Sequence, residues 1–384
     1  MRLGRRCLLR AACAHCVALA GNAFAQADWS PPARFIKPDL ASDEGGLWAL
    51  MDREETRLRR SPFRMRDEAL NKYLQDVVCR LAGDHCPDVR VYAVRTPFFN
   101  ASMAPNGMMQ VWSGLLLRMD NEAQLAAVLG HEIGHFLQRH SVERLRDLKA
   151  RTAFGQFIGM FGVVGLVGQL ATLAGAMAYS RDHEREADRI GLALMRRGGY
   201  DPREASKVWG NLLDELRATP ENDPSKNSVL FASHPASDER RDTLSTLAAG
   251  QTGETAAAAF RDCIAPLRRE LLDDEVKRAR PAETLVLLDR LLAQEPAQPD
   301  LLHARGETRR QRNQIGDLGL ALEDFVAALR TGQEPPATHR SLGYLYRALD
   351  KPDEARAAWQ QYLTRAPDAP DAAWIQQQLQ ETKP

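Results

Sequence analysis

Excess charge of one sign is absent from this 384-residue sequence, in which 51 Lys and Arg residues balance 51 Asp and Glu residues. A strongly basic surface for a polyanion is therefore not indicated, and nucleic acid is not an expected partner. The length exceeds what one ordinary hydrophobic core needs, and it favours two or three domains.

The first 25 residues lack acidic side chains and have the order of a secretory signal peptide. Four arginines in MRLGRRCLLR precede the apolar run AACAHCVALA, and small residues follow up to Ala25. We predict cleavage after Ala25 and export to the periplasm. The Sec route and the twin-arginine route both remain open, because GRRCLLR resembles a twin-arginine signal. A lipid anchor is not indicated, since Cys16 follows His15 where a small residue is required.

Cysteine is scarce in the expected mature chain. An oxidising compartment favours a disulfide between Cys79 and Cys86, the closest pair in the sequence. Buried free thiols are the alternative, and Cys263 is left over in either case.

Residues 152–180 contain no charged residue, and their length is sufficient to span a bilayer. Glycines and two glutamines interrupt the segment, however, and the acidic cluster that follows must return to the histidines that precede it. We therefore favour a hairpin of two short helices that is buried or makes peripheral contact with a membrane, with true insertion as the alternative.

Hydrophobic periodicity predicts a mostly α (α+β) fold with a small sheet. An extended lead-in is expected over 28–46, strands over 89–94 and 108–112 with a PNG turn before the second, and helices over 64–82, 120–140, 179–197, 202–218 and 238–247.

The helix expected over 120–140 carries His131, Glu132 and His135 in an otherwise apolar stretch. Residues four apart lie on one side of a helix, so both imidazoles can bind one zinc ion. Glu132 lies beside them, where it can take a proton from a water held by the metal. This H-E-x-x-H arrangement is typical of zinc peptidases. His140, nine positions from His131, is about 180° away around the helix and is expected to face elsewhere.

A catalytic zinc site needs a third protein ligand. The helix expected over 179–197 offers His183, Glu184, Glu186 and Asp188, and composition alone does not choose among them.

HEIGH followed some fifty residues later by EREAD resembles the M48 family of zinc endopeptidases, over roughly residues 65–245. The resemblance implies a zincin-like fold with Glu184 as the third ligand and Asp188 as the residue that orients a ligand histidine. Glu186 and His183 are then expected on a solvated helix face.

Two further segments resemble the family's pattern. NASMAPNGMMQVWSGLL resembles the segment along the active-site cleft, which implies that Asn100 shapes the cleft rim unless it is a turn residue. SHPASDER implies that His234 polarises the substrate carbonyl or latches onto the zinc. Arg240 either contacts charge in the transition state or pairs with nearby acids. A surface role is the alternative for His234 and Arg240.

The last 120 or so residues read as successive helices. The segment 341–367 matches the tetratricopeptide pattern at the spacing expected of a repeat of about 34 residues, and a looser copy contains Gly306, Ala321 and Phe325. An unrelated helical bundle is the alternative. Such repeats form a concave surface for a partner.

We therefore predict a signal peptide over 1–25, an M48-like domain over 26–262 and a tetratricopeptide-like solenoid over 263–384. The combination resembles bacterial periplasmic peptidases that act on outer-membrane protein assembly. It implies one Zn²⁺ per chain, unfolded or misassembled protein substrates, and contact with the assembly machinery through the repeats. The alternative is a chaperone or adaptor with a latched or inactive peptidase site.

Overall fold

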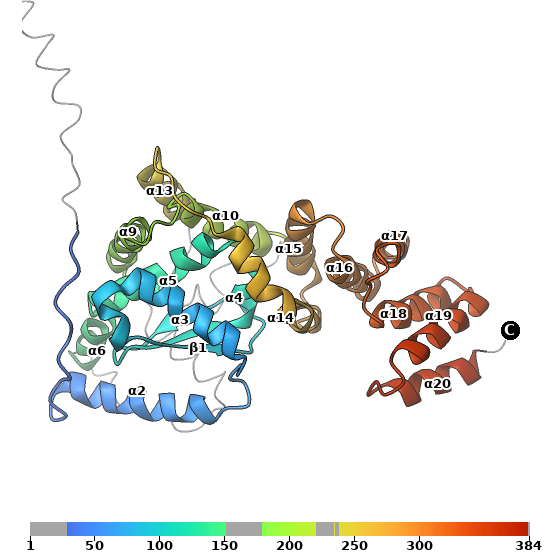
Figure 1. The fold of residues 1–384 in the computed structure, drawn as a ribbon, viewed down its shortest axis with the longest axis horizontal. Helices are drawn as coiled ribbons and strands as arrows, with labels where there is room; N and C mark the ends of the chain where they lie inside the picture. Colours follow the sequence, from blue (N-terminus) through green and yellow to red (C-terminus); the bar gives the residue numbers. More distant parts are fainter. Residues whose placement is uncertain (1–28, 151–178, 220–233, 235–237, 383–384) are drawn as a thin grey trace, which may run out of the picture. The chain divides into compact units, whose positions relative to one another are not determined.

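The computed structural model describes residues 29–150, 179–219, 234 and 238–382 (Figure 1). The predicted signal peptide and nearly all of the predicted hairpin over 152–180 lie outside these residues. The chain up to Ala33 is one unit, in which residues 29–33 have no regular secondary structure, and Arg34–Pro384 is a second unit. In the described part of the chain, no helix combines the length and apolar character needed to cross a membrane.

The second unit begins with helices α2 (Asp43–Arg60) and α3 (Glu68–Ala82), followed by the 3-10 helix η1 (Gly83–Asp88). The predicted extended lead-in over 28–46 is wrong from Asp43 onward, because the Ser42 side chain accepts a hydrogen bond from Gly45 N and caps α2. Gly45 is a packing residue: a Cβ there would lie 1.9 Å from the carbonyl oxygen of Asp39. Cys79 and Cys86 form a disulfide between α3 and η1.

A three-stranded sheet has the order β1 (Arg90–Val94), β3 (Met108–Trp112), β2 (Ala101–Met103). β1 runs parallel to β3, and β2 pairs antiparallel with β3 as an edge strand. The two predicted strands are confirmed, and the PNG turn joins β2 to β3. Gly107 has φ 85° in that turn, and a Cβ there would lie 1.9 Å from Asp88 O, so glycine is required.

Alternation along β1 places its side chains against different helices. Tyr92 and Val94 pack with Leu58 of α2, while α3 packs on β1 and α5 (Glu122–Leu137) packs on β2. A buried carboxylate fixes α2 to the sheet, since Glu55 accepts hydrogen bonds from Arg90 Nη2 at 2.7 Å and from Tyr92 Oη at 2.7 Å. The arrangement of these helices around the sheet is visible in Figure 1.

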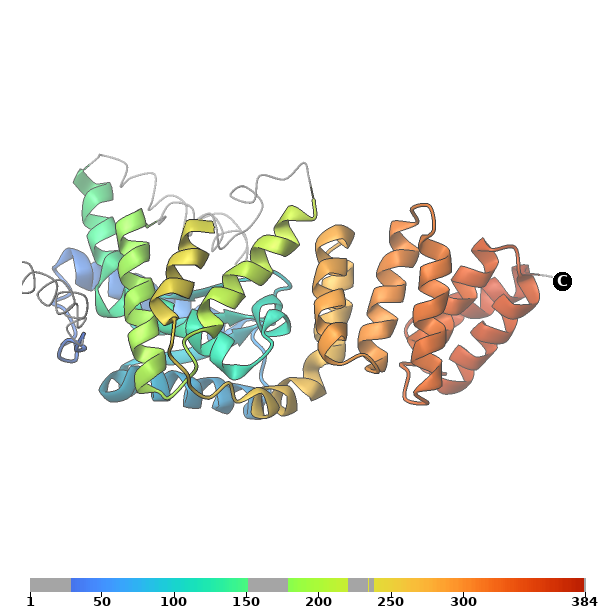
Figure 2. The same cartoon turned by 90° about the horizontal axis from the view of Figure 1, so that it is seen from above.

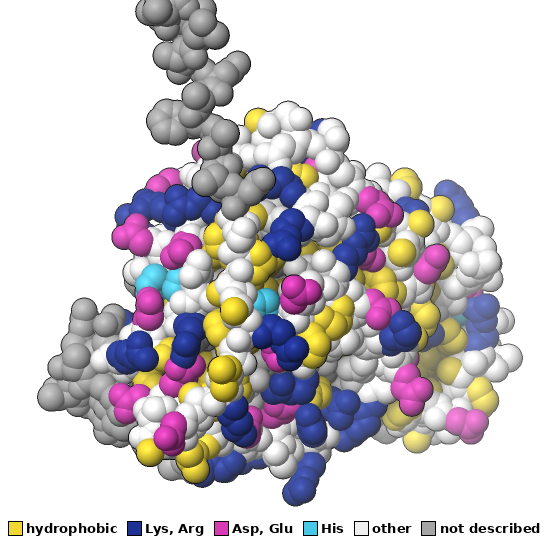
Figure 3. Space-filling model, turned by 60° about the vertical axis from the view of Figure 1, so that its left-hand side comes forward, with side chains coloured by type: hydrophobic (Ala, Val, Ile, Leu, Met, Phe, Trp, Pro, Cys, Tyr) yellow, Lys and Arg dark blue, Asp and Glu magenta, His cyan; other side chains and the backbone are white. Residues whose placement is uncertain are grey.

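The other helices of this part are α4 (Ser113–Arg118), α6 (His140–Ala150), α9 (Arg181–Arg197), α10 (Glu204–Arg217) and α13 (Asp238–Ala248). The helices predicted over 64–82, 179–197, 202–218 and 238–247 are confirmed to within a few residues. The helix predicted over 120–140 is interrupted: α5 ends at Leu137, and α6 begins at His140. Arg139 between them has φ 60°, a left-handed conformation that turns the chain. On the face drawn in Figure 3, basic and acidic side chains are interspersed.

An all-helical region follows, as predicted, in successive packed helices (Figure 2). Its helices are α14 (Ala257–Lys277), α15 (Pro281–Gln294), α16 (Pro299–Arg312), α17 (Asp317–Arg330), α18 (Ala337–Ala348), α19 (Pro352–Arg365) and α20 (Ala372–Glu381).

Within two helix pairs a glycine meets an aromatic ring. A Cβ at Gly306 in α16 would lie 2.7 Å from the Phe325 ring of α17, and one at Gly343 in α18 would lie 2.1 Å from Trp359 of α19. These contacts explain why the sequence pattern has glycine at both positions. The assignment of the helices to the tetratricopeptide class stays a prediction.

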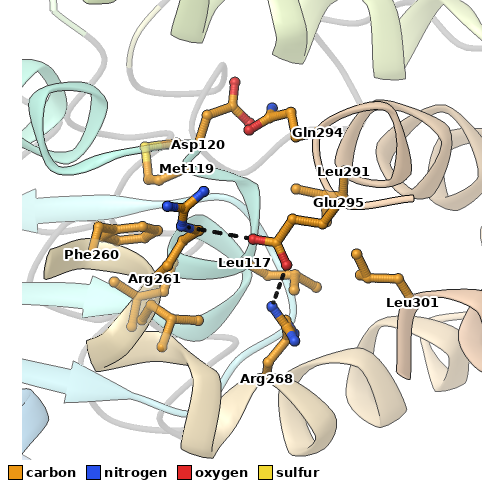
Figure 4. A pocket seen from close by; sticks show the side chains of 12 residues that line it. Leu117, Met119, Asp120, Phe260, Arg261, Arg268, Leu291, Gln294, Glu295 and Leu301 are labelled. Carbon is orange, nitrogen blue, oxygen red and sulfur yellow. Dashed lines mark hydrogen bonds and ion pairs between the residues drawn. The ribbon is translucent and has the colours of Figure 1, made fainter. Parts of the chain in front are cut away.

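Helix α14 packs both on α3, α4 and α5 and on α15 and α16, so the predicted domain boundary at residue 263 lies inside it. At this junction Arg118 is 4% exposed and donates hydrogen bonds to Glu215 of α10 and to both carboxylate oxygens of Glu275 of α14. Burial opposes the charge of Arg118, but the two carboxylates raise its pKa above the ordinary value. A pocket opens nearby between α4, α14 and α15, in which Arg261 and Arg268 pair with Glu295 (Figure 4).

Candidate metal centre

Helix α5 places His131 and His135 side by side. The helix starts where the Asn121 side chain accepts a hydrogen bond from Gln124 N. From Glu122 to Leu137 nearly every side chain is buried, so the two imidazoles have no access to bulk water and require partners inside the protein. Their Nε2 atoms lie 3.1 Å apart, as the four-residue spacing predicts.

A glycine on each of α5 and α9 allows the two helices to approach closely. A Cβ at Gly134 would lie 3.0 Å from Ala187 O, and one at Gly191 would lie 3.1 Å from His131 N. A larger residue at these positions would push the helices apart. Gly134 of the HEIGH segment and Gly191 of α9 therefore allow the close helix packing on which the site depends.

This approach brings the Glu184 carboxylate to the histidines. Its Oε1 lies 3.3 Å from His135 Nε2, and its Oε2 lies 3.5 Å from His131 Nε2. His234 joins from a separate segment, with Nδ1 2.9 Å from Glu184 Oε1 and 3.3 Å from His131 Nε2. In the described ranges of the chain these four residues are the group that could hold a metal ion, with ligand atoms all within 4.8 Å of one another.

The chemistry of this donor set fits zinc. Three imidazole nitrogens and one carboxylate oxygen are ordinary zinc ligands, and neutral imidazoles bring lone pairs together that repel one another unless a cation lies among them. Burial lowers the pKa of His135 well below its ordinary value, opposed by Glu184 and reinforced by the neighbouring imidazoles, which favours the neutral ring that a metal needs.

Asp188 and Arg240 support His131 from behind, as the resemblance implied for Asp188. Asp188 Oδ1 lies 3.0 Å from His131 Nδ1. Arg240 donates hydrogen bonds of 2.7 Å to both Asp188 oxygens, and its Nη1 lies 2.8 Å from Glu184 Oε2. Burial alone would raise the pKa of Asp188, but Arg240 and His131 hold it below the ordinary value. Arg240 thus pairs with buried acids, which was one of its two predicted roles.

Glu132 is 3% exposed and lies beside the cluster. Its Oε1 is 3.5 Å from His234 Nε2 and accepts no hydrogen bond from the described residues. Burial raises its pKa, only partly offset by the charge of His234 and His131. A buried carboxylate with a free oxygen and a raised pKa is suited to accept a proton.

The expectation that His140 faces away is wrong. Its Nδ1 lies 2.9 Å from His135 Nδ1, because the left-handed Arg139 folds the chain back after α5 ends. The prediction that Glu186 and His183 lie on a solvated helix face is only partly correct. The Glu186 side chain is 44% exposed, but the His183 ring stacks on His140 at 4.2 Å between centroids.

Two aromatic residues were not found from the sequence. The Tyr179 ring stacks on His135 at 3.9 Å, and its hydroxyl lies 2.8 Å from Ser141 Oγ. Trp209 of α10 lies under the Arg240 guanidinium, 4.0 Å from ring centroid to Cζ. No spacing rule connects either residue with the HEIGH helix, so the sequence carried no signal for them. Asn100, just before β2, is buried, and its role at the cleft rim stays a prediction.

Comparisons with known proteins agree with this site. Residues 64–248 match the model of peptidase family M48, so this part of the chain is an M48 family domain. The match covers α3 to α13 and includes all four clustered residues and Glu132.

Relatives fall into two named kinds. A beta-barrel assembly-enhancing protease from Yersinia pestis is 30% identical over 237 residues, covering 54% of this chain and 46% of that protein. The protein of that name from Escherichia coli (strain K12) is 29% identical over 231 residues, covering 53% and 45%. The mitochondrial metalloendopeptidase OMA1 of Arabidopsis thaliana is 32% identical over 170 residues, covering 42% and 35%. The chain therefore spans about half the length of the curated relatives it matches.

Proposed function

We propose that the protein is a periplasmic zinc-dependent endopeptidase that hydrolyses peptide bonds of misfolded or misassembled envelope and outer-membrane proteins. The observation that carries the proposal is the convergence of His131, His135 and Glu184 with the free carboxylate oxygen of Glu132 beside them. The names of the relatives and the export signal predicted over residues 1–25 support the location and the class of substrate.

The roles divide among named atoms. His131 Nε2, His135 Nε2 and a Glu184 oxygen would hold the zinc ion, which would polarise the substrate carbonyl and activate water when bound. Glu132 Oε1 takes the proton of the attacking water and passes it to the leaving amine. Asp188 and Arg240 fix the orientation of His131, and Arg240 also holds Glu184.

The edge strand β2 is proposed to hold the substrate. An extended peptide can add to an edge strand through backbone hydrogen bonds. Met103 of β2 and His135 line one small cavity together with Phe136 and Val142, so the strand leads toward the metal centre. A peptide paired with β2 would therefore run toward the metal centre, past this cavity, which Glu44, Arg139 and Ser141 also line.

His234 is the residue that most affects resting activity. Its Nδ1 lies 2.9 Å from Glu184 Oε1 and 3.3 Å from His131 Nε2, so His234 would be a fourth donor at the metal site, where a catalytic zinc needs access for water or substrate. We propose that His234 latches the site and must leave before a substrate carbonyl enters. This position also favours the second candidate, a chaperone or adaptor in which the latch stays closed and the repeats bind clients or the assembly machinery.

Cleavage of an unfolded protein such as casein tests the proposal. The zinc-loaded mature protein is expected to cleave it, and a chelator is expected to stop cleavage. Glu132→Gln should retain one zinc per chain while losing about 10²- to 10⁴-fold in rate, because only the proton acceptor is removed. Normal cleavage by this variant would show that Glu132 is not the base.

His234→Ala separates the two candidates. A latch predicts that this variant cleaves casein faster than the wild type. If both proteins are zinc-replete and neither cleaves unfolded protein, the endopeptidase proposal fails and the binding role is favoured.

A further inference from the structure

The two ligand histidines of α5 are supported in different ways. His131 Nδ1 faces a carboxylate directly, at 3.0 Å from Asp188 Oδ1. His135 Nδ1 instead faces another imidazole, at 2.9 Å from His140 Nδ1. Metal-binding histidines nearly always donate their second ring N–H to an acceptor, and that acceptor fixes the tautomer and the ring orientation. The acceptor for His135 is therefore His140.

The backbone holds His140 in this position. Arg139 adopts φ 60°, which ends α5 and starts α6 at His140, so the imidazole folds back toward the preceding helix. Arg139 is itself held, because its guanidinium pairs with Glu44 of α2 and lies over the Phe35 ring. His140 is 1% exposed, so water does not compete for its Nδ1.

The hydrogen positions follow from the geometry. His135 Nε2 points to the cluster, 3.1 Å from His131 Nε2 and 3.3 Å from Glu184 Oε1, so a neutral ligand ring carries its hydrogen on Nδ1. His140 Nδ1 must then accept that hydrogen, which places the hydrogen of neutral His140 on Nε2. His140 Nε2 lies 3.4 Å from Glu186 Oε2 of α9, where it donates to the carboxylate.

We propose that His140 and Glu186 are positioning residues for the metal ligand His135. They form a relay in which His135 Nδ1–H donates to His140 Nδ1 and His140 Nε2–H donates to Glu186. The relay rests on the proposed metal site and gives His135 the carboxylate support that Asp188 gives His131. Ligand geometry is thereby fixed from both helices that flank the cluster, α6 and α9.

A neighbouring pair provides a matched control. The His183 ring stacks on His140 at an interplanar angle of 16°, and its Nε2 lies 3.3 Å from Glu143 Oε2. The Glu143 side chain is 55% exposed and that of Glu186 is 44% exposed. Glu143→Gln thus removes the same charge at the same histidine cluster without removing a hydrogen bond of the relay, although the Glu143 charge also acts on His140.

Zinc affinity of the full-length mature apoprotein, measured by competition with a chromophoric chelator, tests the relay. His140→Leu removes the acceptor and is expected to weaken zinc binding about 10- to 100-fold. His140→Asn places an amide oxygen near the former Nδ1, so it should recover most of that loss. Glu186→Gln should cause a smaller loss than His140→Leu, and Glu143→Gln should cause none.

Two results would overturn the relay while leaving the metal site intact: wild-type affinity in His140→Leu, or equal losses in His140→Leu and His140→Asn. Failure of the wild type to bind zinc would instead overturn the proposed function. ¹⁵N NMR of histidine-labelled, zinc-loaded wild type needs no variant. It should show the His140 hydrogen on Nε2, and a hydrogen on Nδ1 would also overturn the relay.

Discussion

Two clusters of buried charged and titratable groups, the metal centre and the α4–α14 junction, are equally hidden from water but differently paired. At the junction, Glu275 is 1% exposed, and its oxygens accept from Arg118 and from Thr284 Oγ1. At the metal centre, His131 is 4% exposed, and its Nε2 faces the nitrogens of two other imidazoles as well as Arg240 Nη2 and Glu184 Oε2.

The difference separates structure from function. Opposite charges that pair with each other hold two helices together and need no additional ligand. Nitrogen lone pairs that converge on one point are unfavourable by themselves and become favourable when a cation binds. A buried polar cluster whose groups repel one another therefore indicates a ligand-binding site. A buried cluster whose charges pair indicates a structural contact between helices.

The largest effect on stability is expected at the junction. Arg118→Ala leaves Glu215 and Glu275 buried without their main partner, so the free energy of unfolding should fall by about 3 kcal/mol. Urea denaturation measures it. Arg95→Ala is the control, because Arg95 pairs with Asp274 of the same helix α14 from an exposed position and should cost less than about 1 kcal/mol. Equal losses in the two variants would show that burial of the network is unimportant.

Metal removal should have the next largest effect. Zinc at the proposed site would bind only the folded state, so free zinc at 100 times its Kd would stabilise the protein by about 2.7 kcal/mol, and a chelator would remove this stabilisation. The thermal midpoint of the wild type should fall on chelation. His135→Ala should show no such fall, because it has lost a ligand, while His339→Ala in the helical region should respond like the wild type. If the chelator leaves the thermal midpoint of the wild type unchanged, the metal centre does not need a ligand and does not differ in this respect from the α4–α14 junction.

Loss of support behind His131 should have a moderate effect. Asp188→Asn keeps the shape of the side chain but removes the charge that Arg240 and His131 face, so zinc affinity should fall about 10- to 100-fold. Chelator competition measures it. Asp182→Asn changes an exposed carboxylate on the same helix and should bind zinc like the wild type.

The smallest effect concerns Glu55, a buried carboxylate outside both clusters. It tests whether a buried acid whose oxygens accept hydrogen bonds behaves as a structural group. Burial would raise its pKa, but hydrogen bonds from Arg90 and Tyr92 lower it to about 2. Its stabilisation is therefore fully present above the unfolded pKa of about 4.3 and is lost as the pH falls toward 2. Glu55→Gln should lower the free energy of unfolding by about 1 kcal/mol at pH 7. Unfolding measured at pH 7 and pH 3 should show the gap between variant and wild type closing in acid, and a constant gap would contradict the assignment.

Local patterns predicted the parts of the site that depend on spacing along one element. His131 and His135 share a helix side because they are four apart. The two predicted strands form where they were expected, but nearly all of their side chains are buried instead of alternating with exposed ones. Glu184 was chosen over Glu186 only through the family resemblance, because their spacing from the histidines along the chain does not say which one α9 turns inward. The close packing of α9 on α5 at Gly134 and Gly191 determines that Glu184 is the residue turned toward the histidines.

The parts that failed depend on single backbone angles or on distant pairs. His140 turns back toward α5 because Arg139 has a positive φ, and the sequence has no glycine at this position to indicate a turn. The pairing of Arg118 with Glu275 joins residues 157 positions apart, and no periodicity reports such a contact. The beginning of α2 was missed because Gly45 and Gly46 suggest a loop, although Gly45 is needed for close packing against Asp39.

Helix α14 has a practical consequence for protein production. A catalytic fragment ending at residue 262 would cut this helix within its second turn, discard Glu275 and leave Arg118 with Glu215 as the remaining one of its two carboxylate partners. Ending the fragment after Gln294 would retain both Glu275 and Arg290, which pairs with Asp120 beside α4. Expression trials of the isolated peptidase should therefore carry α14 and α15 along as part of the enzyme.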